Sequence, residues 1–429
     1  MLTSPVVSES NGLHKKPRIA LVLSGGGSRG AYEAGILAWM FENVYPRLGD
    51  HFEFDIISGT SVGAIHAAYV ACTAGLAPVE RARGIVDTWK QMRFDNVLQL
   101  SWTDFLGIPL RGLGFGSLRK RGDRDAPESM GGLVDIGPLE RLVHTRIPWN
   151  RLRANLEAGR PSVLCNAVTE VNSGVVRIFL DGPGADTSPW SYDPHVDAVI
   201  TKITQLHVRA SAAIPFLFPA VRVDGRYYVD GGLRLNTPLS PAVRLGADKV
   251  MVIGLKKRVP KLEKPEFSDV ASLSKPAFLL GKLLDVMLLD PIENELRQLE
   301  IVNALIAGGK ETFGEDFAER MAPALRQVRG AGYKPVEFFM QSPSEDIGRI
   351  AADCYHRGSA GSGSRGVIAA LIKQAATLGV PKSEADFLSY IYFDNDYTNT
   401  LVELGREDAK ASQDEILALL EPSAQGTLM

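Results

Sequence analysis

Apolar runs and helical spacings alternate through the first part of the chain. Residues 18–23 (RIALVL) predict a buried strand, followed by a glycine-rich turn and by AYEAGILAWMFENV, whose apolar residues recur at helical spacing. Residues 54–57 (FDII) predict a second strand, and the small apolar residues from Val62 to Ala68 predict a second helix. Strands that alternate with helices in this way are typical of an α/β fold with a parallel sheet.

Further helices and strands follow in the same manner. Residues 78–93 and 138–158 predict helices, and SVLCNAVTEVNSGVVRIFL predicts two strands around an Asn-Ser-Gly turn. A helix is expected to end near Ala213. Asp224-Gly225 then predicts a hairpin turn whose returning strand is RYYVD. One more core strand lies within DKVMVIGLKKR and closes on a basic cluster.

The chain changes character after this strand. Residues 270–308 predict mostly helix, residues 334–341 predict one more strand, and the remainder is mainly helical. We therefore expect three parts: a disordered tail over 1–17, a three-layer α/β/α unit with a mainly parallel sheet over 18–258, and a largely helical extension over 259–429 that packs on this unit.

Composition and charge exclude several classes of function. The 429 residues carry a net charge of -3, so no overall attraction to nucleic acid is expected. Three widely spaced cysteines without a CxxC pair argue against a disulfide framework and against a cysteine zinc site. The first 17 residues lack the apolar region of a signal peptide, and no run approaches the roughly 18 apolar residues of a membrane span. These features predict a cytoplasmic protein.

Residues 99–124 form the one stretch that suggests contact with a membrane. They interleave Trp102, Phe105 and Phe115 with several arginines. Aromatic and cationic side chains in this mixture lie at lipid interfaces or form a flap over an apolar groove. A solvated loop with a basic turn is the alternative.

Ser61 lies where the second predicted strand gives way to its helix. Gly59 and Gly63 flank it as Gly-x-Ser-x-Gly, the pattern of a nucleophile elbow, in which the sharp turn leaves no room for a Cβ on either side. The elbow should expose the hydroxyl at the amino end of a helix, where developing negative charge is favoured. An N-capping serine in an ordinary βα turn is the structural alternative.

The glycine-rich turn SGGGSRG follows the first predicted strand. Gly25, Gly27 and Gly30 satisfy G-x-G-x-x-G, the pattern of a dinucleotide site. However, the next strand ends in the serine elbow instead of the acidic residue that would bind a ribose. Consecutive glycines can also turn backbone N–H groups toward an oxyanion, and both turns should open at one edge of the sheet. Arg29 would add positive charge there, or it would serve as a surface or ion-pairing arginine.

Asp230 ends the predicted strand RYYVD and precedes two glycines. By itself this pattern is typical of a turn, but beside a serine elbow the carboxylate becomes a candidate base. Beyond Asp230 the chain offers one histidine, His356, within the Gly/Ser-rich stretch YHRGSAGSGSRG, which predicts a poor scaffold for a general base. His66, five residues past Ser61, should point to the opposite side of its helix. A Ser61–Asp230 dyad is the simplest hypothesis.

Taken together, these motifs resemble those of the patatin-like phospholipase family. The resemblance covers roughly residues 18–258 and rests on SGGGSRG, GTSVG, ASAAIPFLFP and VDGGLRLNTPL, in that order. It implies a catalytic domain over this range. It further implies that Ser61 is the nucleophile, that Asp230 followed by Gly231 and Gly232 is the proton acceptor, and that no metal or cofactor takes part. The implied oxyanion turn comprises Gly25, Gly26, Gly27, Ser28, Arg29 and Gly30.

The expected activity is hydrolysis of phospholipids or other acyl esters. Three alternatives stay open at this point: acyl transfer to an acceptor other than water, lipid binding with little turnover, and a dinucleotide-dependent oxidoreductase. The last of these depends on the glycine turn alone.

Overall fold

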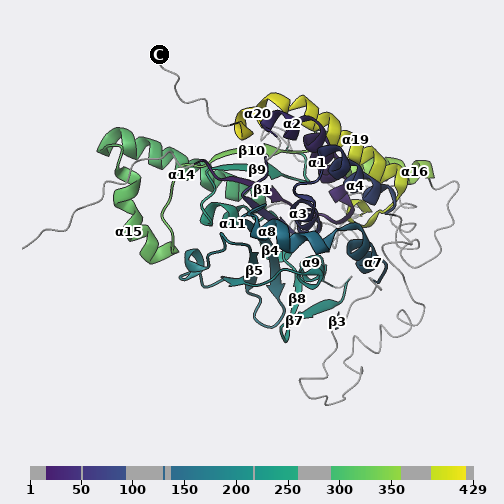
Figure 1. Ribbon diagram of the computed structural model, residues 1–429, viewed down its shortest axis with the longest axis horizontal. Helices are drawn as coiled ribbons and strands as arrows, with labels where there is room; N and C mark the ends of the chain where they lie inside the picture. The colour runs from purple at the N-terminus through teal and green to yellow at the C-terminus, as the bar shows by residue number, and fades with distance from the viewer. Residues whose placement is uncertain are drawn as a thin grey trace, which may run out of the picture.

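The computed structural model describes residues 16–49, 52–92, 129–130, 137–215, 218–258, 291–358 and 388–421 (Figure 1). The predicted tail, the stretch 99–124 and the linker after residue 258 lie largely or wholly outside these residues. Within them, the strands are β1 (Ile19–Leu23), β2 (Ile56–Thr60), β3 (Ser129–Met130), β4 (Val163–Glu170), β5 (Val176–Asp181), β6 (Val196–Ile200), β7 (Ala220–Val223), β8 (Arg226–Asp230), β9 (Lys249–Ile253) and β10 (Glu337–Gln341).

All these strands belong to one sheet, with the main order β10-β9-β1-β2-β4-β8-β7-β3, and β5 and β6 branch from β4. The strands from β10 to β4 run parallel, whereas β8, β7 and β3 continue the sheet in antiparallel pairings. Because β9, β1 and β2 are in register, Ile253, Leu23 and Gly59 lie side by side near the carboxyl edge. The loops after these strands therefore open at a common edge.

Helices cover both faces of the sheet (Figure 1). The longer ones are α1 (Gly30–Asn43), α3 (Val62–Thr73), α4 (Pro78–Lys90), α7 (Gly137–Arg146), α14 (Pro291–Phe313), α15 (Phe317–Arg329), α16 (Ile347–Gly358) and α19 (Asn395–Ala411). The shorter ones are α2 (Tyr45–Leu48), α8 (Leu152–Glu157), α9 (Gln205–Ser211), α10 (Gly232–Leu235), α11 (Leu239–Arg244), α20 (Gln413–Leu420) and the 3-10 turns η1 (Gly27–Arg29), η3 (Trp149–Arg151) and η4 (Ser188–Trp190).

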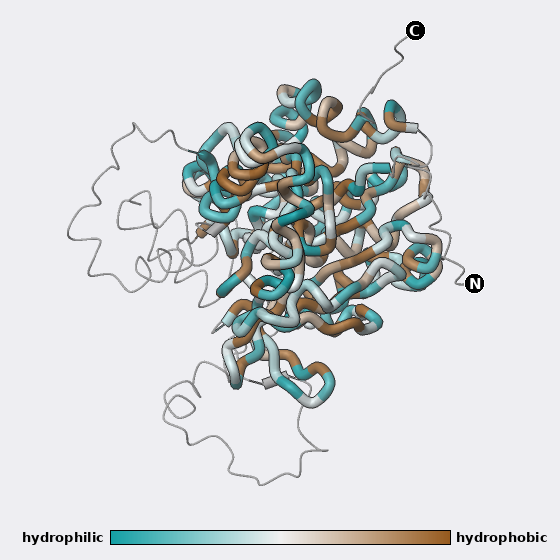
Figure 2. The backbone as a smooth tube through the Cα atoms, turned by 90° about the vertical axis from the view of Figure 1, so that its left-hand side faces the viewer, coloured by the Kyte–Doolittle hydropathy of each residue, from teal (hydrophilic) through white to brown (hydrophobic). Residues whose placement is uncertain are grey.

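Two apolar cores lie on opposite faces of the sheet. Alternate residues of β1 divide between them: Leu21 and Leu23 pack with α1, α3, α4 and α19, whereas Ala20 and Val22 pack with α11 and α14. This alternation is what a strand buried on both faces requires. Figure 2 shows apolar stretches running through the middle of the molecule, with polar ones more frequent at its edges. The predicted three-layer α/β class with a mainly parallel sheet is confirmed.

The carboxyl-terminal helix α19 is packed closely on α1. A Cβ added to Gly35 of α1 would lie 2.1 Å from the carbonyl oxygen of Val402, and one added to Gly405 of α19 would lie 2.2 Å from that of Tyr32. Glycines at both contact points let the two backbones approach directly. Tyr32 also donates a hydrogen bond to Asp408 at 2.9 Å. The segment 388–421 is therefore part of the same core as the first helix of the chain.

Several local predictions can be compared with the structure. The hairpin turn is present, with Asp224 and Gly225 both at positive φ, 47° and 83°. The strand at 334–341 is β10, and α9 ends at Ser211, close to the predicted Ala213. The expectation that His356 lies in a loop is wrong, because it occupies the last turn of α16. No helix in the described ranges is both long and apolar enough to cross a bilayer.

Candidate active site

Ser61 adopts a strained backbone conformation at the corner between β2 and α3. Its φ of 56° and ψ of -125° are unusual for a residue with a side chain. A Cβ added to Gly59 would lie 2.3 Å from the carbonyl oxygen of Gly63, and one added to Gly63 would lie 2.3 Å from that of Leu23. Both flanking glycines are thus required because backbone passes directly over them. This is the geometry that the Gly-x-Ser-x-Gly pattern predicts.

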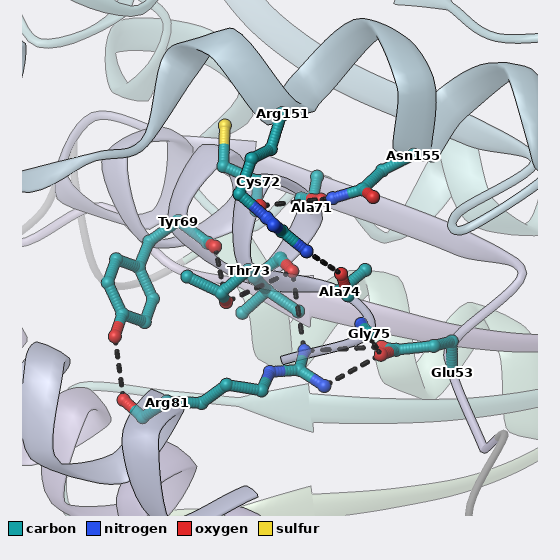
Figure 3. A network of polar contacts seen from close by, with 11 residues as sticks. Glu53, Tyr69, Ala71, Cys72, Thr73, Ala74, Gly75, Arg81, Arg151 and Asn155 are labelled. Carbon is teal, nitrogen blue, oxygen red and sulfur yellow. Dashed lines mark hydrogen bonds and ion pairs between the residues drawn. The ribbon is translucent and has the colours of Figure 1, made fainter. Parts of the chain in front are cut away.

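The helix that begins after Ser61 is secured at its far end (Figure 3). Three side chains donate hydrogen bonds to the backbone carbonyls at this end. Arg81 donates to Val70, Asn155 to Ala71 and Cys72, and Arg151 to Ala74, the residue after the helix. Arg81 also forms a two-pronged ion pair with Glu53, at 2.7 and 3.2 Å. Cationic donors at a carboxyl terminus satisfy free carbonyls and complement the helix dipole. These bonds fix the position of α3 and so of the serine at its start.

The glycine-rich turn after β1 lies directly against the elbow. A Cβ added to Gly25 would be 3.0 Å from the Ser61 Cβ, and one added to Gly30 would be 2.4 Å from a methyl group of Val62. Asn236, which follows α10, holds the turn from below: its carbonyl accepts the Gly25 N–H at 3.0 Å, and its side-chain amide donates to the Gly25 carbonyl at 3.1 Å. Asn236 lies within the motif VDGGLRLNTPL, but the sequence did not single it out as a residue of the site.

The N–H groups of this turn are not equivalent. Gly25 donates to Asn236, Arg29 donates to Gly26, and Gly30 donates back into η1, so these three amides are already engaged. Among the described residues, the N–H groups of Gly26, Gly27 and Ser28 have no backbone acceptor. Gly27 has a φ of 57°, which turns the chain at this point. In the predicted oxyanion turn, the N–H groups available to bind an anion are therefore the three adjacent ones at the start of η1.

Asp230 ends β8, which lies on the side of β4 opposite to β2 and Ser61. Thr60 pairs with Ala167 and Asp230 pairs with Val168, so Ser61 comes level with Asp230 across the intervening strand. Residues at the same level on strands two apart have backbones about 9.5 Å from each other, and two side chains that extend toward each other can span this distance. A Cβ on Gly231 would lie 2.4 Å from the Ala167 carbonyl, which shows how closely the aspartate turn approaches β4.

The Asp230 carboxyl is buried and weakly solvated. Its Oδ1 accepts the Gly232 N–H at 2.7 Å, whereas Oδ2 has no partner at ordinary hydrogen-bond geometry. Burial raises the pKa of Asp230 to about 7, and hydrogen bonding with the Ser61 hydroxyl and the Gly232 N–H limits the rise. Ser61 is thus near enough to affect the carboxyl without an ideal hydrogen bond, as is common before substrate binds.

Both side chains are buried, and Ser61 is less accessible than the sequence predicts. Ser61 is 4% exposed and Asp230 is 1% exposed, so the expectation of an exposed hydroxyl is wrong. The physical reason is that Gly25 packs against Ser61 on one side, while the Ser211 hydroxyl accepts the Ser61 N–H at 3.0 Å on another. Ser211 in turn donates to the Ala167 carbonyl at 2.6 Å.

The described histidines do not contact these two residues. His66 is buried on α3, where its Nδ1 lies 2.5 Å from Glu33 and its Nε2 accepts the Trp89 indole N–H at 2.9 Å. His207 contributes to the capping box of α9, and His356 is exposed on α16. Within the described ranges, no hydrogen bond of Ser61 or Asp230 involves a histidine. The same ranges hold no group of three or more His, Cys, Asp or Glu side chains placed to bind a metal ion.

A narrow crevice lies one helical turn from the serine. Its walls are mostly apolar, and the Glu140–Arg209 ion pair between α7 and α9 borders it. Ala212 connects the crevice to the site because it lies between Ser211, which bonds Ser61, and Ala213, whose carbonyl accepts the Asp230 N–H. The lining residues are Ile65, Leu139, Glu140, Val143, Val208, Arg209, Ala212 and Phe218.

A comparison with protein families identifies what this chain is. The family model for patatin-like phospholipase matches residues 21–243, just over half of the 429 residues. The chain belongs to the patatin-like phospholipase family. The matched range includes the serine elbow, the glycine-rich turn and the aspartate turn, so the resemblance predicted from the motifs is confirmed.

The relatives of this patatin-like protein differ from it in length. An uncharacterized NTE family protein of Mycobacterium bovis is 26% identical over 239 residues, which make up 56% of this chain and 49% of the relative. A protein of the same description from Mycobacterium tuberculosis gives the same values. The chain thus spans about half the length of the curated relatives it matches.

A comparison with solved structures gives weak similarity to two proteins. VipD from Legionella pneumophila is 14% identical, with a TM-score of 0.31 and coverage of 91% of this chain and 67% of VipD. Human GIVD cytosolic phospholipase A2 is 13% identical, with a TM-score of 0.42 and coverage of 94% and 59%. These scores are low, and membership of the patatin-like family rests on the sequence match.

Proposed function

We propose that this protein hydrolyses acyl esters of phospholipids or related lipids, with Ser61 as nucleophile and Asp230 as its proton acceptor. One observation carries the proposal. A serine on a strained strand-to-helix corner lies level with a buried carboxyl group whose pKa is raised to about 7. A base with a pKa near the working pH is well suited to accept a proton and return it.

The proposed reaction has two steps. The Ser61 oxygen attacks the ester carbonyl carbon while its proton passes to Asp230, which gives a tetrahedral intermediate. The intermediate collapses, the alcohol leaves with the proton from Asp230, and the acyl group stays on Ser61. Water then attacks the acyl-serine, again losing a proton to Asp230. That proton returns to the serine oxygen as the fatty acid leaves.

The negative charge of each intermediate needs donors close to Ser61. The N–H groups of Gly26, Gly27 and Ser28 fit this role because they lack backbone acceptors in the described structure and belong to the turn that touches the serine. Fixed donors in a site that excludes water stabilise an oxyanion without reorganisation. The positive end of the α3 dipole adds to this effect.

The crevice beside α3 has a volume of about 10 Å³, which is room for about one water molecule, so an acyl chain would lie against its apolar walls only after they part. Ile65, Val208 and Phe218 offer apolar surface close to Ser61, and a fatty acyl group gains free energy by leaving water for such a surface. Long acyl esters should therefore be preferred to acetyl esters.

Labelling and hydrolysis together test the proposal. Wild-type protein should react with a fluorophosphonate probe at Ser61 and hydrolyse p-nitrophenyl esters and phospholipid vesicles. Ser61→Ala should lose labelling and roughly 10⁴-fold or more in turnover, with its thermal unfolding little changed. Ser58→Ala is the matched control, since Ser58 is a buried serine on the same strand, and it should retain both activities.

Other results would redirect the proposal. Labelling without ester hydrolysis, but with acyl groups passed to an added alcohol, would indicate acyl transfer. Vesicle binding without labelling would indicate a lipid-binding protein. Equilibrium binding of NAD or NADP would indicate a dinucleotide enzyme, although the glycine turn is packed against the carbonyl of Tyr390. Ser61→Ala protein with wild-type turnover would exclude the assignment of the nucleophile.

A further inference from the structure

The glycine-rich turn is held by a segment that lies 360 residues away in the sequence. This segment, Ser389–Tyr390, precedes α19, and we call it the carboxyl-terminal clamp. The Ser28 hydroxyl donates to the Ser389 carbonyl at 2.7 Å, and the Arg29 Nε donates to the Ser389 hydroxyl at 2.7 Å. Two consecutive side chains of η1 therefore bond to one residue of the clamp.

Arg29 does not point toward Ser61 or solvent. It is 2% exposed, its guanidinium lies 4.2 Å from the centre of the Tyr390 ring, and its Nη1 reaches the Leu255 carbonyl at 3.5 Å. A guanidinium held by hydrogen bonds and stacked on an aromatic ring has a fixed direction. Arg29 therefore links the turn after β1 to the clamp and to the end of β9.

The clamp also determines which residue can occupy position 27. A Cβ on Gly27 would lie 2.2 Å from the Tyr390 carbonyl oxygen. The clamp is itself secured, because the Tyr397 hydroxyl of α19 donates to the Ser389 carbonyl at 3.0 Å. A continuous set of contacts thus runs from α19 through Ser389 to the three amides proposed to bind the oxyanion.

We propose that Ser389 and Tyr390 are positioning residues that hold the Gly26–Ser28 amides in the orientation that binds the oxyanion. In the described structure neither residue bonds to Ser61, and they act through Ser28, Arg29 and Gly27. This inference rests on the proposed function. Its consequence is that the carboxyl-terminal segment takes part in catalysis although it lies outside the range matched by the family model.

A single hydroxyl can be removed to test this role. Ser389→Ala deletes the hydroxyl that accepts from the Arg29 Nε and keeps the carbonyl that accepts from Ser28 and Tyr397. Thr398→Val is the matched control, because the Thr398 hydroxyl is buried in the first turn of α19 and, among the described residues, bonds only to carbonyls of Asp394 and Asn395. Both variants are compared with wild type by thermal unfolding and by kcat and KM on a short p-nitrophenyl ester.

The decisive readout is affinity for a trifluoromethyl ketone that carries the same acyl chain. Its adduct with serine carries the oxyanion, so its Ki follows stabilisation of the transition state and not binding of the ground state. For Ser389→Ala we expect kcat to fall roughly tenfold or more, Ki to rise by a similar factor, and KM to stay within about twofold. Thr398→Val should change neither kcat nor Ki.

A double mutant separates positioning from general stabilisation. Arg29→Met removes the donor to Ser389 and keeps most of the side-chain volume. If the two residues act as one unit, Ser389→Ala/Arg29→Met should lose little more kcat/KM than the stronger single variant. Additive losses, or a lower unfolding temperature with unchanged kcat and Ki, would overturn the inference while leaving the proposed function intact. Wild-type protein that neither labels nor hydrolyses would overturn both.

Discussion

The two halves of the candidate site are held in different ways. The serine elbow is fixed by backbone packed on backbone, since Gly59 and Gly63 contact carbonyls of the elbow itself and of the neighbouring strand. The glycine-rich turn is fixed by residues from distant parts of the sequence, and the side chains of Asn236, Ser389 and Tyr390 supply much of this hold beside their backbone carbonyls. Protein interiors yield little at close backbone contacts, whereas a contact made by a side chain can be lost singly. The nucleophile is thus built into the sheet, and the oxyanion turn depends on assembly of the whole chain.

The largest expected effect is at the elbow. Gly63→Ala places a Cβ 2.3 Å from the Leu23 carbonyl, and neither β1 nor α3 can move away without disturbing the core. We expect roughly 3 kcal/mol or more of lost stability and a nearly complete loss of fluorophosphonate labelling. Thermal unfolding and labelling measure the two effects.

A glycine without neighbours provides the control for this change. Gly308→Ala in α14 adds a Cβ with no heavy atom within 4 Å, and it should stabilise the helix by about 0.5–1 kcal/mol. If Gly63→Ala proved as stable and as reactive as wild type, backbone contact would not be what fixes the elbow.

The next effect is at the turn. Gly27→Ala meets the Tyr390 carbonyl at 2.2 Å and also imposes a positive φ on alanine. Only the Tyr390 carbonyl oxygen lies within 3.0 Å of the new Cβ, whereas three backbone atoms do so at Gly63. We therefore expect a smaller loss of stability, about 1–3 kcal/mol, but a fall in kcat/KM of roughly 100-fold. Steady-state kinetics and thermal unfolding check both numbers.

Gly225→Ala is the control that shows how much of the Gly27→Ala effect comes from backbone strain and how much from displacing the clamp. Gly225 also has a positive φ, 83°, but at the tip of a hairpin its Cβ would approach only the end of the Arg222 side chain, at 4.0 Å. Its substitution should cost about 1 kcal/mol and leave kcat/KM unchanged. If Gly27→Ala and Gly225→Ala lost equal activity, the contact between the glycine-rich turn and the clamp would not be what supports catalysis.

The same contrast explains what the sequence could predict. The elbow and the alternation of strands and helices depend on residues close together in the chain, so Gly59, Ser61 and Gly63 reveal the corner directly. Their short-range pattern needs no knowledge of tertiary contacts. Asp230 could be identified from its motif. That it lies beside Ser61 in the fold could not, because this depends on the pairing of β8 with β4.

Other features could not be predicted because they depend on long-range contacts. Nothing local in Arg29 indicates that it bonds to Ser389, and nothing in Asn236 indicates that it holds Gly25. The burial of Ser61 likewise results from segments that converge only in the folded chain. The Gly/Ser-rich appearance of the stretch after Tyr355 concealed that His356 still belongs to a helix.

The pH dependence should distinguish proton transfer from oxyanion binding. Because the base must be ionised and the pKa of Asp230 is raised to about 7, kcat/KM should rise about tenfold per pH unit below 7 and level off above it. Ser389→Ala should show the same midpoint with a lower plateau, since it affects the oxyanion turn and not the carboxyl. A shifted midpoint in Ser389→Ala would show that the two halves are coupled.

The raised pKa also predicts how stability changes with pH. The carboxyl is more easily ionised in the unfolded chain, so its contribution to stability is fully present below about pH 4 and is lost as the pH rises through about 7. Asp230→Asn mimics the neutral form. Its stability relative to wild type should therefore increase by about 3 kcal/mol between pH 5 and pH 8, while its activity is lost. Thermal unfolding across this range gives the difference.

The smallest expected effect tests whether the clamp or the whole helix α19 controls the turn. Arg406 of α19 forms a two-pronged, partly exposed ion pair with Glu42 of α1, at 2.7 and 3.2 Å. Glu42→Gln weakens the attachment of α19 without touching Ser389, and a partly exposed pair contributes about 0.5 kcal/mol. We expect a slightly lower unfolding temperature and unchanged kcat and trifluoromethyl ketone Ki. A tenfold loss of kcat would mean that the placement of α19 as a whole orients the three amides, and the contrast between a rigid elbow and a turn held by single side chains would no longer stand.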